Sequence, residues 1–266
     1  QTKPFYPDGR GQLRAAVQKQ HAQWQVQRLI QMPRTVVVLL GESSTRNNWN
    51  HYAYARPTTL TLENTLAQLP GRTLWLDHAW SAEAFTLQSL RLAFTPATKE
   101  TPDLWRSTPD MLQLAKAADY RVTWLSNQPG AEGWFAAMAA QADKRRFINH
   151  GNWRDSSSID ADLLPVLQQE LQAPAATYEF IVLHLLGQHF HYQQRCPDGL
   201  MPFPPTEDDA VIKAMQQAGR SQSTIAARNA YDNALYCGAD MLAKAVRMID
   251  SFRPKRSLQV LYFSDH

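Results

Sequence analysis

The sequence predicts an α/β protein, a three-layer α/β/α sandwich built on a mostly parallel sheet. Five short apolar segments, rich in β-branched and aromatic residues, have the continuous hydrophobicity of strands covered on both faces. Segments of helical periodicity alternate with them, which is typical of an open parallel sheet with helices on both sides. The 266 residues, 44% of them hydrophobic, are enough to bury a sizeable core.

The predicted elements follow one another in order along the chain. Strands are expected over residues 34–43, 72–80, 120–128, 178–187 and 257–266. Helices are expected over 59–69, 85–94, 109–118, 131–145, 160–171 and 221–251. The last helix has the strongest pattern, because its apolar residues recur at the spacing of one buried stripe. Residues 195–206 contain five prolines and glycines and predict an irregular excursion before it.

Two parts are expected along the chain. Residues 1–33 are predicted to form a surface helix that leads in from elsewhere, and residues 34–266 one domain, since no internal repeat or linker interrupts them. The sequence stops at Asp265 and His266, at the carboxyl end of a predicted strand. Ligand sites of parallel sheets lie at that edge, so we expect a chain cut inside its active site, with a C-terminal part missing.

Composition excludes several classes of protein. The 27 basic and 24 acidic residues give a net charge of +3, spread along the chain, which does not indicate a nucleic-acid partner. No apolar run approaches the roughly 18 residues of a membrane span. The two cysteines, Cys196 and Cys237, cannot build a thiolate zinc site, and their pairing stays open. Neither a G-x-S-x-G elbow nor a nucleotide-binding glycine pattern occurs.

Polar residues gather at the expected carboxyl edge of the sheet. Glu42 lies at the end of the first strand, residues 77–86 form the end of the second and its turn, and Asp265 with His266 end the last. Carboxylates and an imidazole at separate strand ends suit a divalent metal of the zinc type, with one position left for substrate. Taken singly, each of these residues could equally be a capping or turn residue, but the three together favour a metal site.

Thr86 is the preferred nucleophile among the hydroxyl groups near this edge. It lies where a loop becomes a helical pattern, and helix starts direct free N–H groups at a bound anion such as a phosphoryl group. A hydroxyl at a helix start is, however, often only an N-cap. The other hydroxyl groups, none as clearly at a helix start, are those of Ser43, Ser44, Thr45 and Ser81.

Three histidines lie within eight residues at the end of the fourth predicted strand. His184 lies inside its apolar run and is expected to be structural. His189 and His191 come after a glycine, and His189 is the one expected to reach substrate. Three imidazoles near this edge favour contact with an anion or a metal.

Six motifs, in order, carry a resemblance to a known family. They are VVVLLGESSTRNNWNHYAYARPTT (36–59), SAEAFTLQSL (81–90), WLSNQ (124–128), HLLGQHFHY (184–192), YDNALY (231–236) and LYFSDH (261–266). Together they resemble the bacterial phosphoethanolamine transferases of the sulfatase and alkaline-phosphatase superfamily, over nearly the whole chain from residue 36.

The resemblance implies an alkaline-phosphatase-like catalytic domain on the periplasmic side of the bacterial inner membrane, attached through missing N-terminal membrane helices. It implies one Zn²⁺ ion, with a second left open, held by Glu42, Thr86, Asp265 and His266. Thr86 matches the catalytic nucleophile of the family, which would form a covalent phosphothreonine. His189 matches a histidine expected to bind the transferred phosphate or a second metal.

The implied reaction transfers phosphoethanolamine from phosphatidylethanolamine to an envelope acceptor. Lipid A or other lipopolysaccharide, core heptose and periplasmic glucans all stay open as acceptors. A sulfatase-like phosphodiesterase or phosphoglycerol transferase is the alternative enzyme, although formylglycine sulfatases need a cysteine or serine where Thr86 stands. A non-catalytic relative that binds a lipid head group is the third alternative.

Overall fold

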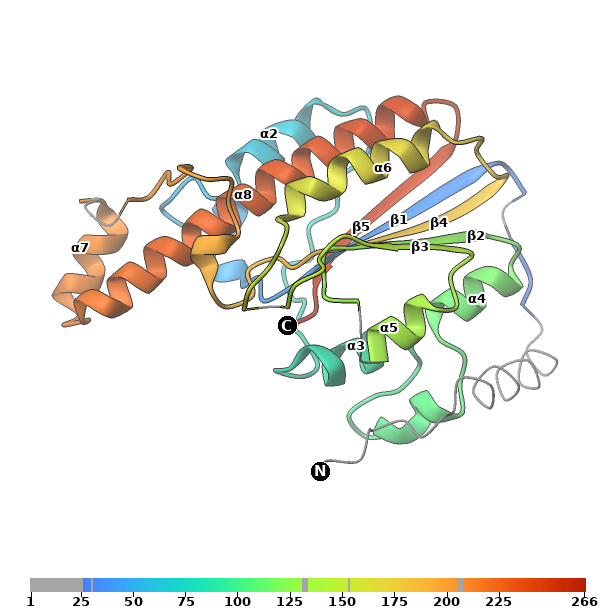
Figure 1. Cartoon of the computed structure of the whole chain (residues 1–266), viewed down its shortest axis with the longest axis horizontal. Helices are drawn as coiled ribbons and strands as arrows, with labels where there is room; N and C mark the ends of the chain where they lie inside the picture. The colour runs from blue at the N-terminus through green and yellow to red at the C-terminus, as the bar shows by residue number, and fades with distance from the viewer. Residues whose placement is uncertain (1–25, 30, 131–133, 153, 205–207) are drawn as a thin grey trace.

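A computed structural model describes residues 26–29, 31–130, 134–152, 154–204 and 208–266. Its centre is a five-stranded sheet of order β3-β2-β4-β1-β5, in which every neighbouring pair is parallel. The strands are β1 (Arg34–Gly41), β2 (Arg121–Ser126), β3 (Lys144–Phe147), β4 (Tyr178–His184) and β5 (Ser257–Ser264). All five carboxyl ends therefore lie at one edge, where the C-terminus also lies (Figure 1).

Helices cover both faces of the sheet, which confirms the three-layer sandwich (Figure 1). One face carries α2 (Leu60–Gln68), α6 (Leu163–Gln172) and α8 (Gln222–Phe252), and the other carries α3 (Thr86–Phe94), α4 (Met111–Ala117) and α5 (Trp134–Ala139). A further helix, α7 (Ala210–Gln217), lies beside the N-terminal half of α8. Short 3-10 helices span Arg46–Asn48, Asn50–Tyr52, Pro102–Arg106, Asp160–Asp162 and Tyr192–Gln194.

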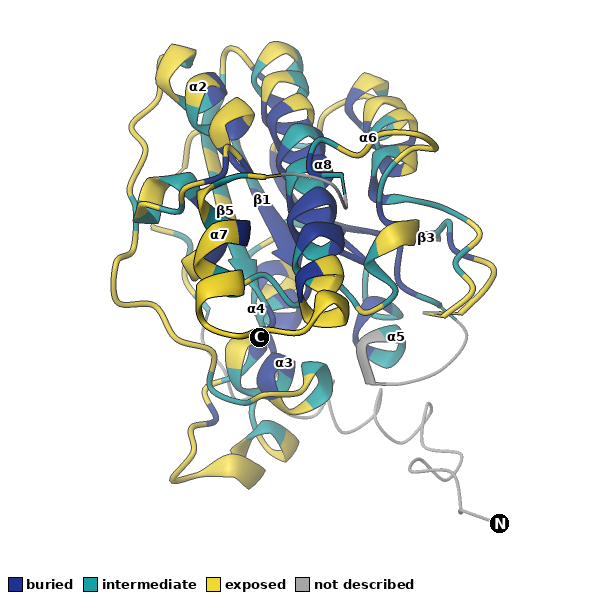
Figure 2. Ribbon diagram, turned by 90° about the vertical axis from the view of Figure 1, so that its left-hand side faces the viewer, coloured by how far each residue is buried: buried dark blue, intermediate teal, exposed yellow. Residues whose placement is uncertain are grey.

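The central strands are buried on both faces because successive side chains enter two different cores. In β1, Leu39 belongs to the core under α6 and α8, whereas Leu40 belongs to the core under α3 and α4. In β4, Ile181 and Val182 divide in the same way. Figure 2 shows these strands dark blue beneath helices with yellow outer faces. The continuous apolar runs of the sequence are thus explained.

Residues 72–80 do not form the predicted strand. They are coil and turn, and all except the half-buried Trp75 are exposed. Trp75 stacks on His51 with ring centroids 3.9 Å apart and meets Trp49 edge-on, so its burial comes from a loop and not from a neighbouring strand. Only Trp75 of this segment therefore packs, outside the sheet, while its other apolar side chains, Leu74, Leu76 and Trp80 among them, are exposed.

The predicted helix over 131–145 is also only partly correct. The structure has α5 at Trp134–Ala139 and then the strand β3 at Lys144–Phe147, which pairs with β2 at the sheet edge. The first three residues of β3 are exposed and basic, so they lack the apolar run typical of a buried strand. Charged side chains on an edge strand protect it from pairing with other chains, and such strands give little signal in a sequence.

The predicted lead-in helix over 1–33 falls mostly outside the described residues. Its described positions, 26–29 and 31–33, contain no helix. Among the described helices, none combines the length and apolar character needed to cross a membrane.

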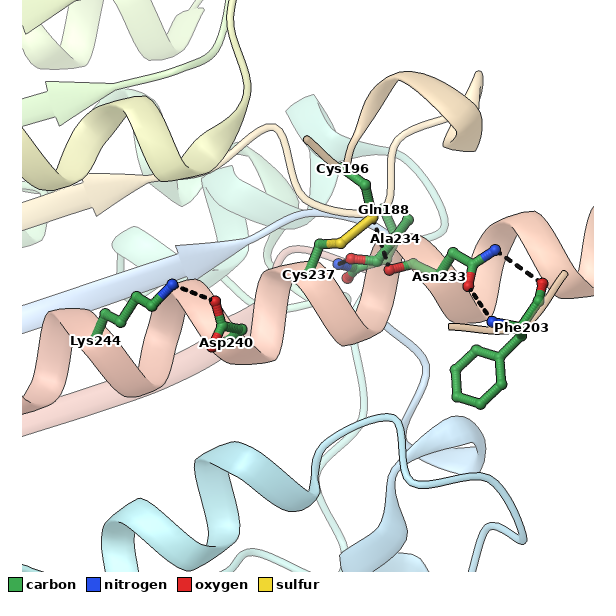
Figure 3. Close-up of a disulfide and its surroundings, with 8 residues drawn as sticks. All are labelled: Gln188, Cys196, Phe203, Asn233, Ala234, Cys237, Asp240 and Lys244. Atoms are coloured by element: carbon green, nitrogen blue, oxygen red, sulfur yellow. Dashed lines mark hydrogen bonds and ion pairs between the residues drawn. A yellow bond between two sulfur atoms is a disulfide. The ribbon is translucent and has the colours of Figure 1, made fainter. Parts of the chain in front are cut away.

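A disulfide joins the excursion after β4 to the middle of α8 (Figure 3). Cys196 and Cys237, whose pairing the sequence left open, have Cα atoms 5.5 Å apart and are bonded. Beside them, the side-chain amide of Asn233 accepts a hydrogen bond from the backbone N–H of Phe203 at 2.8 Å and donates one to the carbonyl of Phe203 at 3.0 Å. The irregular segment is therefore attached to α8 at two places.

Candidate metal centre

Two adjacent strands bring the candidate metal ligands together. β1 and β5 run parallel with Gly41 opposite Ser264, so Glu42 and Asp265 leave the sheet side by side. The backbone N–H of Asp265 donates to the carbonyl of Gly41 at 3.1 Å, which continues the ladder past the strand end. Sheet register alone thus joins residues more than 200 positions apart in the chain.

Glu42, Asp265 and His266 form a compact cluster. One ligand atom from each lies within 4.8 Å of the others, and both carboxylates are only 1% exposed. His266 Nε2 lies 3.1 Å from Glu42 Oε1. Ser43 bonds to both carboxylates of the cluster. Its N–H donates to Asp265 Oδ1 at 3.1 Å, and its hydroxyl donates to Glu42 Oε1 at 2.8 Å.

Thr86 lies beside this cluster as the first residue of α3. Its Oγ1 donates a hydrogen bond to Glu42 Oε2 at 3.1 Å. The N-cap position is taken by Phe85, with no side-chain capping bond, so Thr86 is not an N-cap residue. One turn later, Ser89 donates to the carbonyl of Asp265, and Ser81 donates to the same oxygen at 2.9 Å. These bonds hold the start of α3 against the end of β5.

The pKa values of the three residues in this cluster are shifted in different directions. Burial opposes the ionisation of Glu42, but hydrogen bonds from His266 and Ser43 outweigh it and lower the pKa of that carboxyl group. Burial and the negative charge of Glu42 raise the pKa of Asp265. The hydrogen bond with Glu42 raises the pKa of His266. Asp265 and His266 therefore hold their protons more tightly than isolated groups would, and a cation would take the place of these protons.

The donor set fits a zinc ion. Two carboxylates and an imidazole are typical zinc ligands, and ligand atoms about 2.1 Å from a tetrahedral ion lie about 3.4 Å apart. The 3.1 Å between His266 Nε2 and Glu42 Oε1 is close to that spacing. Asp265 Oδ2 is buried with no hydrogen-bond partner among the described residues. A buried carboxylate oxygen without a donor favours a cation next to it.

The three histidines at and after the end of β4 have different surroundings. His184 is fully buried, where its ring meets Trp124 edge-on, and burial lowers its pKa to about 4. His189 is half-buried and outside the three-residue cluster, although it interacts electrostatically with Glu42 and His266. His191 has a left-handed backbone, with φ of 71°, at the start of a 3-10 helix.

The other candidate hydroxyl groups have structural partners. Ser43 bonds to Glu42, Ser44 accepts from the Trp49 indole at 3.1 Å, and Ser81 donates to Asp265 as described above. Thr45 is exposed, and its backbone N–H donates to Tyr231. Among the described hydrogen bonds, two candidate hydroxyl groups donate to Glu42, those of Ser43 and Thr86. Ser43 belongs to the loop after β1, whereas Thr86 reaches Glu42 from α3.

Asp160 supports the site and was not identified from the sequence. It is buried and accepts hydrogen bonds from the N–H groups of Leu186 and Gly187 and from the Asn127 amide, each at 2.8 Å. Burial raises the pKa of Asp160. The loop after β4 is held in this way against Glu42, whose carbonyl accepts from the N–H of Gln188 at 2.9 Å. Asp160 is the first residue of the helix predicted over 160–171, and nothing in the sequence distinguished it from other residues at helix starts.

A cavity of about 1830 Å³ opens beside the cluster. Asp265 and His266 line one part of it, and Arg46, Arg228 and Tyr231 line another. Its walls also include aromatic and aliphatic side chains of residues 72–80 and of β5. Of the candidate metal ligands, Asp265 and His266 therefore border a large, partly apolar cavity.

Fold and site together define a three-layer α/β/α protein with a candidate metal centre at the carboxyl edge of its sheet. The family model described as Sulfatase matches residues 34–266, and the chain belongs to this family. The alkaline-phosphatase-like fold and the expected resemblance are thereby confirmed.

Two named relatives and one solved structure are similar to most of this chain. The chain is 28% identical over 237 residues to the phosphoethanolamine transferase EptC of Escherichia coli, covering 88% of this chain and 39% of that protein. It is 29% identical, with the same coverage, to the phosphoethanolamine transferase CptA of Salmonella typhimurium. The crystal structure of the C-terminal periplasmic domain of Escherichia coli EptC in complex with zinc superposes with a TM-score of 0.80 at 27% identity, covering 89% of this chain and 64% of that one.

Proposed function

We propose that this chain is the periplasmic catalytic domain of a zinc-dependent phosphoethanolamine transferase. It would move phosphoethanolamine from phosphatidylethanolamine to lipopolysaccharide or another envelope glycan. The observation that carries the proposal is the hydrogen bond from Thr86 Oγ1 to Glu42 Oε2, at 3.1 Å. This bond joins the hydroxyl of the candidate nucleophile to one carboxylate of the three-residue cluster. The names of the relatives support the group that is transferred.

Glu42, Asp265 and His266 would hold the zinc ion, with Thr86 next to it. A zinc ion bound there lowers the pKa of a neighbouring hydroxyl group and neutralises charge on phosphoryl oxygens. The zinc complex of the related periplasmic domain supports this choice of metal. One ion accounts for the three-residue cluster of the described residues.

The residues of the chain then carry the first transfer. The Thr86 hydroxyl directs its proton toward Glu42, which leaves an oxygen lone pair to attack phosphorus in line. A bond forms between Thr86 Oγ1 and phosphorus while the bond from phosphorus to the glycerol oxygen breaks. The glycerol oxygen takes up the proton that Thr86 gave up and leaves as diacylglycerol, and phosphoethanolamine stays on Thr86.

The second transfer returns Thr86 to its starting state. An acceptor hydroxyl attacks phosphorus, the bond to Thr86 Oγ1 breaks, and Thr86 regains a proton. We assign His189 to the transferred phosphoryl group, because it is half-buried and interacts electrostatically with the cluster from outside it. The N–H groups at the start of α3 face the same region and favour a bound anion.

The periplasmic location is part of the proposal. The disulfide between Cys196 and Cys237 is typical of an oxidising compartment. Because the chain spans 39% of the length of the relatives named above, membrane attachment is proposed through parts outside this sequence. Residues 34–266 would be the catalytic domain, and residues 1–33 would lead to it from the membrane.

Trapping the covalent state tests the function. The zinc-loaded chain is incubated with a short-chain phosphatidylethanolamine, quenched in acid and analysed by peptide mass spectrometry. We expect phosphoethanolamine on Thr86 and none in Thr86→Ala, while Thr108→Ala, at an exposed hydroxyl away from the site, behaves as wild type. Modification of Ser43 or Ser81 in place of Thr86 would show that the nucleophile is wrongly assigned.

A further inference from the structure

Ser43 has an unusual backbone conformation beside the metal ligands. Its φ is 53°, in the left-handed region that residues with a side chain seldom adopt. From this conformation its N–H reaches Asp265 Oδ1 and its hydroxyl reaches Glu42 Oε1. One strained residue therefore positions both carboxylates of the cluster, and the surrounding structure has to hold it there.

Tyr231, on α8, makes the contacts that hold Ser43. Its hydroxyl donates to the carbonyl of Ser43 at 2.9 Å and accepts from the N–H of Thr45, also at 2.9 Å. A single phenol thus bridges the backbone on both sides of Ser44. Burial raises the pKa of Tyr231 to about 12, so the hydroxyl keeps its proton and can donate at neutral pH.

The next residue of α8 fixes the rest of the same loop. Asp232 is fully buried and accepts hydrogen bonds from Asn48 at 2.7 Å, from the Tyr54 hydroxyl at 2.6 Å and from Arg56 at 2.8 Å. Consecutive helix positions point in different directions, so Tyr231 and Asp232 reach two separate parts of the loop that follows β1. The helix therefore serves as a fixed support for this loop.

We propose that Tyr231 is a positioning residue for the metal centre, whose hydroxyl holds Ser43 in the conformation that orients Glu42 and Asp265. The proposal rests on the zinc site proposed above. Without the phenol oxygen, the carbonyl of Ser43 and the N–H of Thr45 lose their partner. Ser43 then relaxes toward negative φ, and its N–H and hydroxyl leave the two carboxylates. The described hydrogen bonds of the Tyr231 hydroxyl go to the backbone of Ser43 and Thr45 and not to Glu42, Asp265 or His266, so its effect is on ligand geometry.

Zinc affinity, measured by competition with a chromogenic chelator, tests this role without any turnover. Loss of a group that orients metal ligands typically weakens affinity by about 10- to 100-fold, and we expect that range for Tyr231→Phe. The matched control is Tyr192→Phe, because the Tyr192 ring lies edge-on to Tyr231 with centroids 5.3 Å apart and no described hydrogen bond joins it to the cluster. Its affinity should stay within about twofold of wild type.

A second variant removes the other half of the same bridge. Thr45 has φ of −81°, which proline adopts, so Thr45→Pro deletes the N–H that Tyr231 accepts while the loop keeps its path. We expect it to weaken zinc binding in the same direction as Tyr231→Phe. Thermal unfolding of the zinc-free proteins, within a few degrees of wild type, would show that both variants fold.

The outcomes separate this proposal from the proposed function. Equal zinc affinities for wild type, Tyr231→Phe and Thr45→Pro would overturn the positioning role and leave the zinc site intact. A wild-type chain with no zinc affinity would overturn the zinc site and this role with it. Weaker binding by both variants, with Tyr192→Phe unchanged, supports the positioning role.

Discussion

Gly187 lies directly against Glu42. Its φ is +53°, and a Cβ atom at this position would lie 2.6 Å from the carbonyl oxygen of Glu42. The glycine has two separate reasons to be there, its left-handed backbone and the close approach of the metal-ligand loop. Its sequence neighbour Gln188 donates to that same carbonyl oxygen, so the two loops are in contact along their backbones.

Gly187→Ala should therefore damage both stability and the site. We expect the free energy of unfolding to fall by about 2 kcal/mol or more, from backbone strain and from displacement of Glu42. Gly199→Ala is the matched control, because its φ is +77° but nothing lies within 4 Å of the added carbon. Denaturant unfolding gives the stability of each variant, and chelator competition gives its zinc affinity. If both variants lose zinc to the same extent, the contact with Glu42 is irrelevant.

Glu42→Gln should weaken zinc binding strongly while the protein stays folded. The amide keeps the shape of the side chain but removes the negative charge that attracts both His266 and the metal. We expect affinity to fall at least about 100-fold, as for the loss of a direct ligand. Metal content after gel filtration measures it, with the exposed Glu100→Gln as control. Full zinc occupancy in Glu42→Gln would exclude this residue from the metal site.

In the zinc-free protein, Asp265 and His266 should each contribute stability that is lost as pH rises, Asp265 between its usual pKa of 3.8 and about 7 and His266 above 6.5. The pKa of Asp265 and that of His266 are raised in the folded protein, so the folded state binds their protons more tightly than the unfolded state does. That stability is present at lower pH and disappears as the two groups deprotonate. Below about 6.5, His184 acts in the opposite direction, because its lowered pKa disfavours the proton in the folded state.

Thermal unfolding in the presence of a chelator, scanned across neutral pH, measures this dependence. Asp265→Asn should remove the part of the decline that Asp265 contributes up to about pH 7, because it removes that titrating group. Glu42 should contribute no slope above its usual pKa of 4.5, since its pKa is lowered from that value. An identical pH dependence in wild type and Asp265→Asn would contradict the proton sharing inferred for the cluster.

Asp160→Asn should loosen the loop after β4. The amide presents a donor where the carboxylate accepted two backbone N–H groups, so at least one buried N–H loses its partner. The expected loss is about 1–3 kcal/mol in unfolding free energy. Hydrogen exchange at Leu186 and Gly187 should also quicken. The exposed Asp198→Asn is the control, and equal exchange rates in both variants would argue against this function of Asp160.

Removal of the disulfide should destabilise the fold without unfolding it. Cys196 and Cys237 are 41 residues apart, and a bridge across such a loop typically contributes about 2 to 4 kcal/mol. Urea unfolding of the Cys196→Ala/Cys237→Ala variant measures the change. Wild type treated with a reductant should lose a similar amount. An unchanged midpoint would mean that the contacts of Asn233 with Phe203 already hold this segment.

Local patterns in the sequence were sufficient for most of the fold. Continuous apolar runs identified β1, β2 and β4, which are buried along most of their length, and also β5, which is only partly buried. The apolar stripe identified α8 within one residue at each end. The same reasoning failed in two segments. Residues 72–80 resemble a strand but pack as a loop, whereas β3 is exposed and charged and gave no signal.

The sequence by itself determined the fold class and the candidate residues, since periodicity and strand ends are properties of neighbouring positions. Only the tertiary structure decided which of those residues meet. Glu42 and His266 are joined by the parallel register of β1 and β5, and Thr86 is brought to them by α3. Asp160 and Tyr231 act through hydrogen bonds to the backbone of distant loops. Nearly every residue type offers the same backbone hydrogen-bonding groups. Which of these groups a side chain meets depends on the folded arrangement, so no pattern in the sequence predicts such bonds.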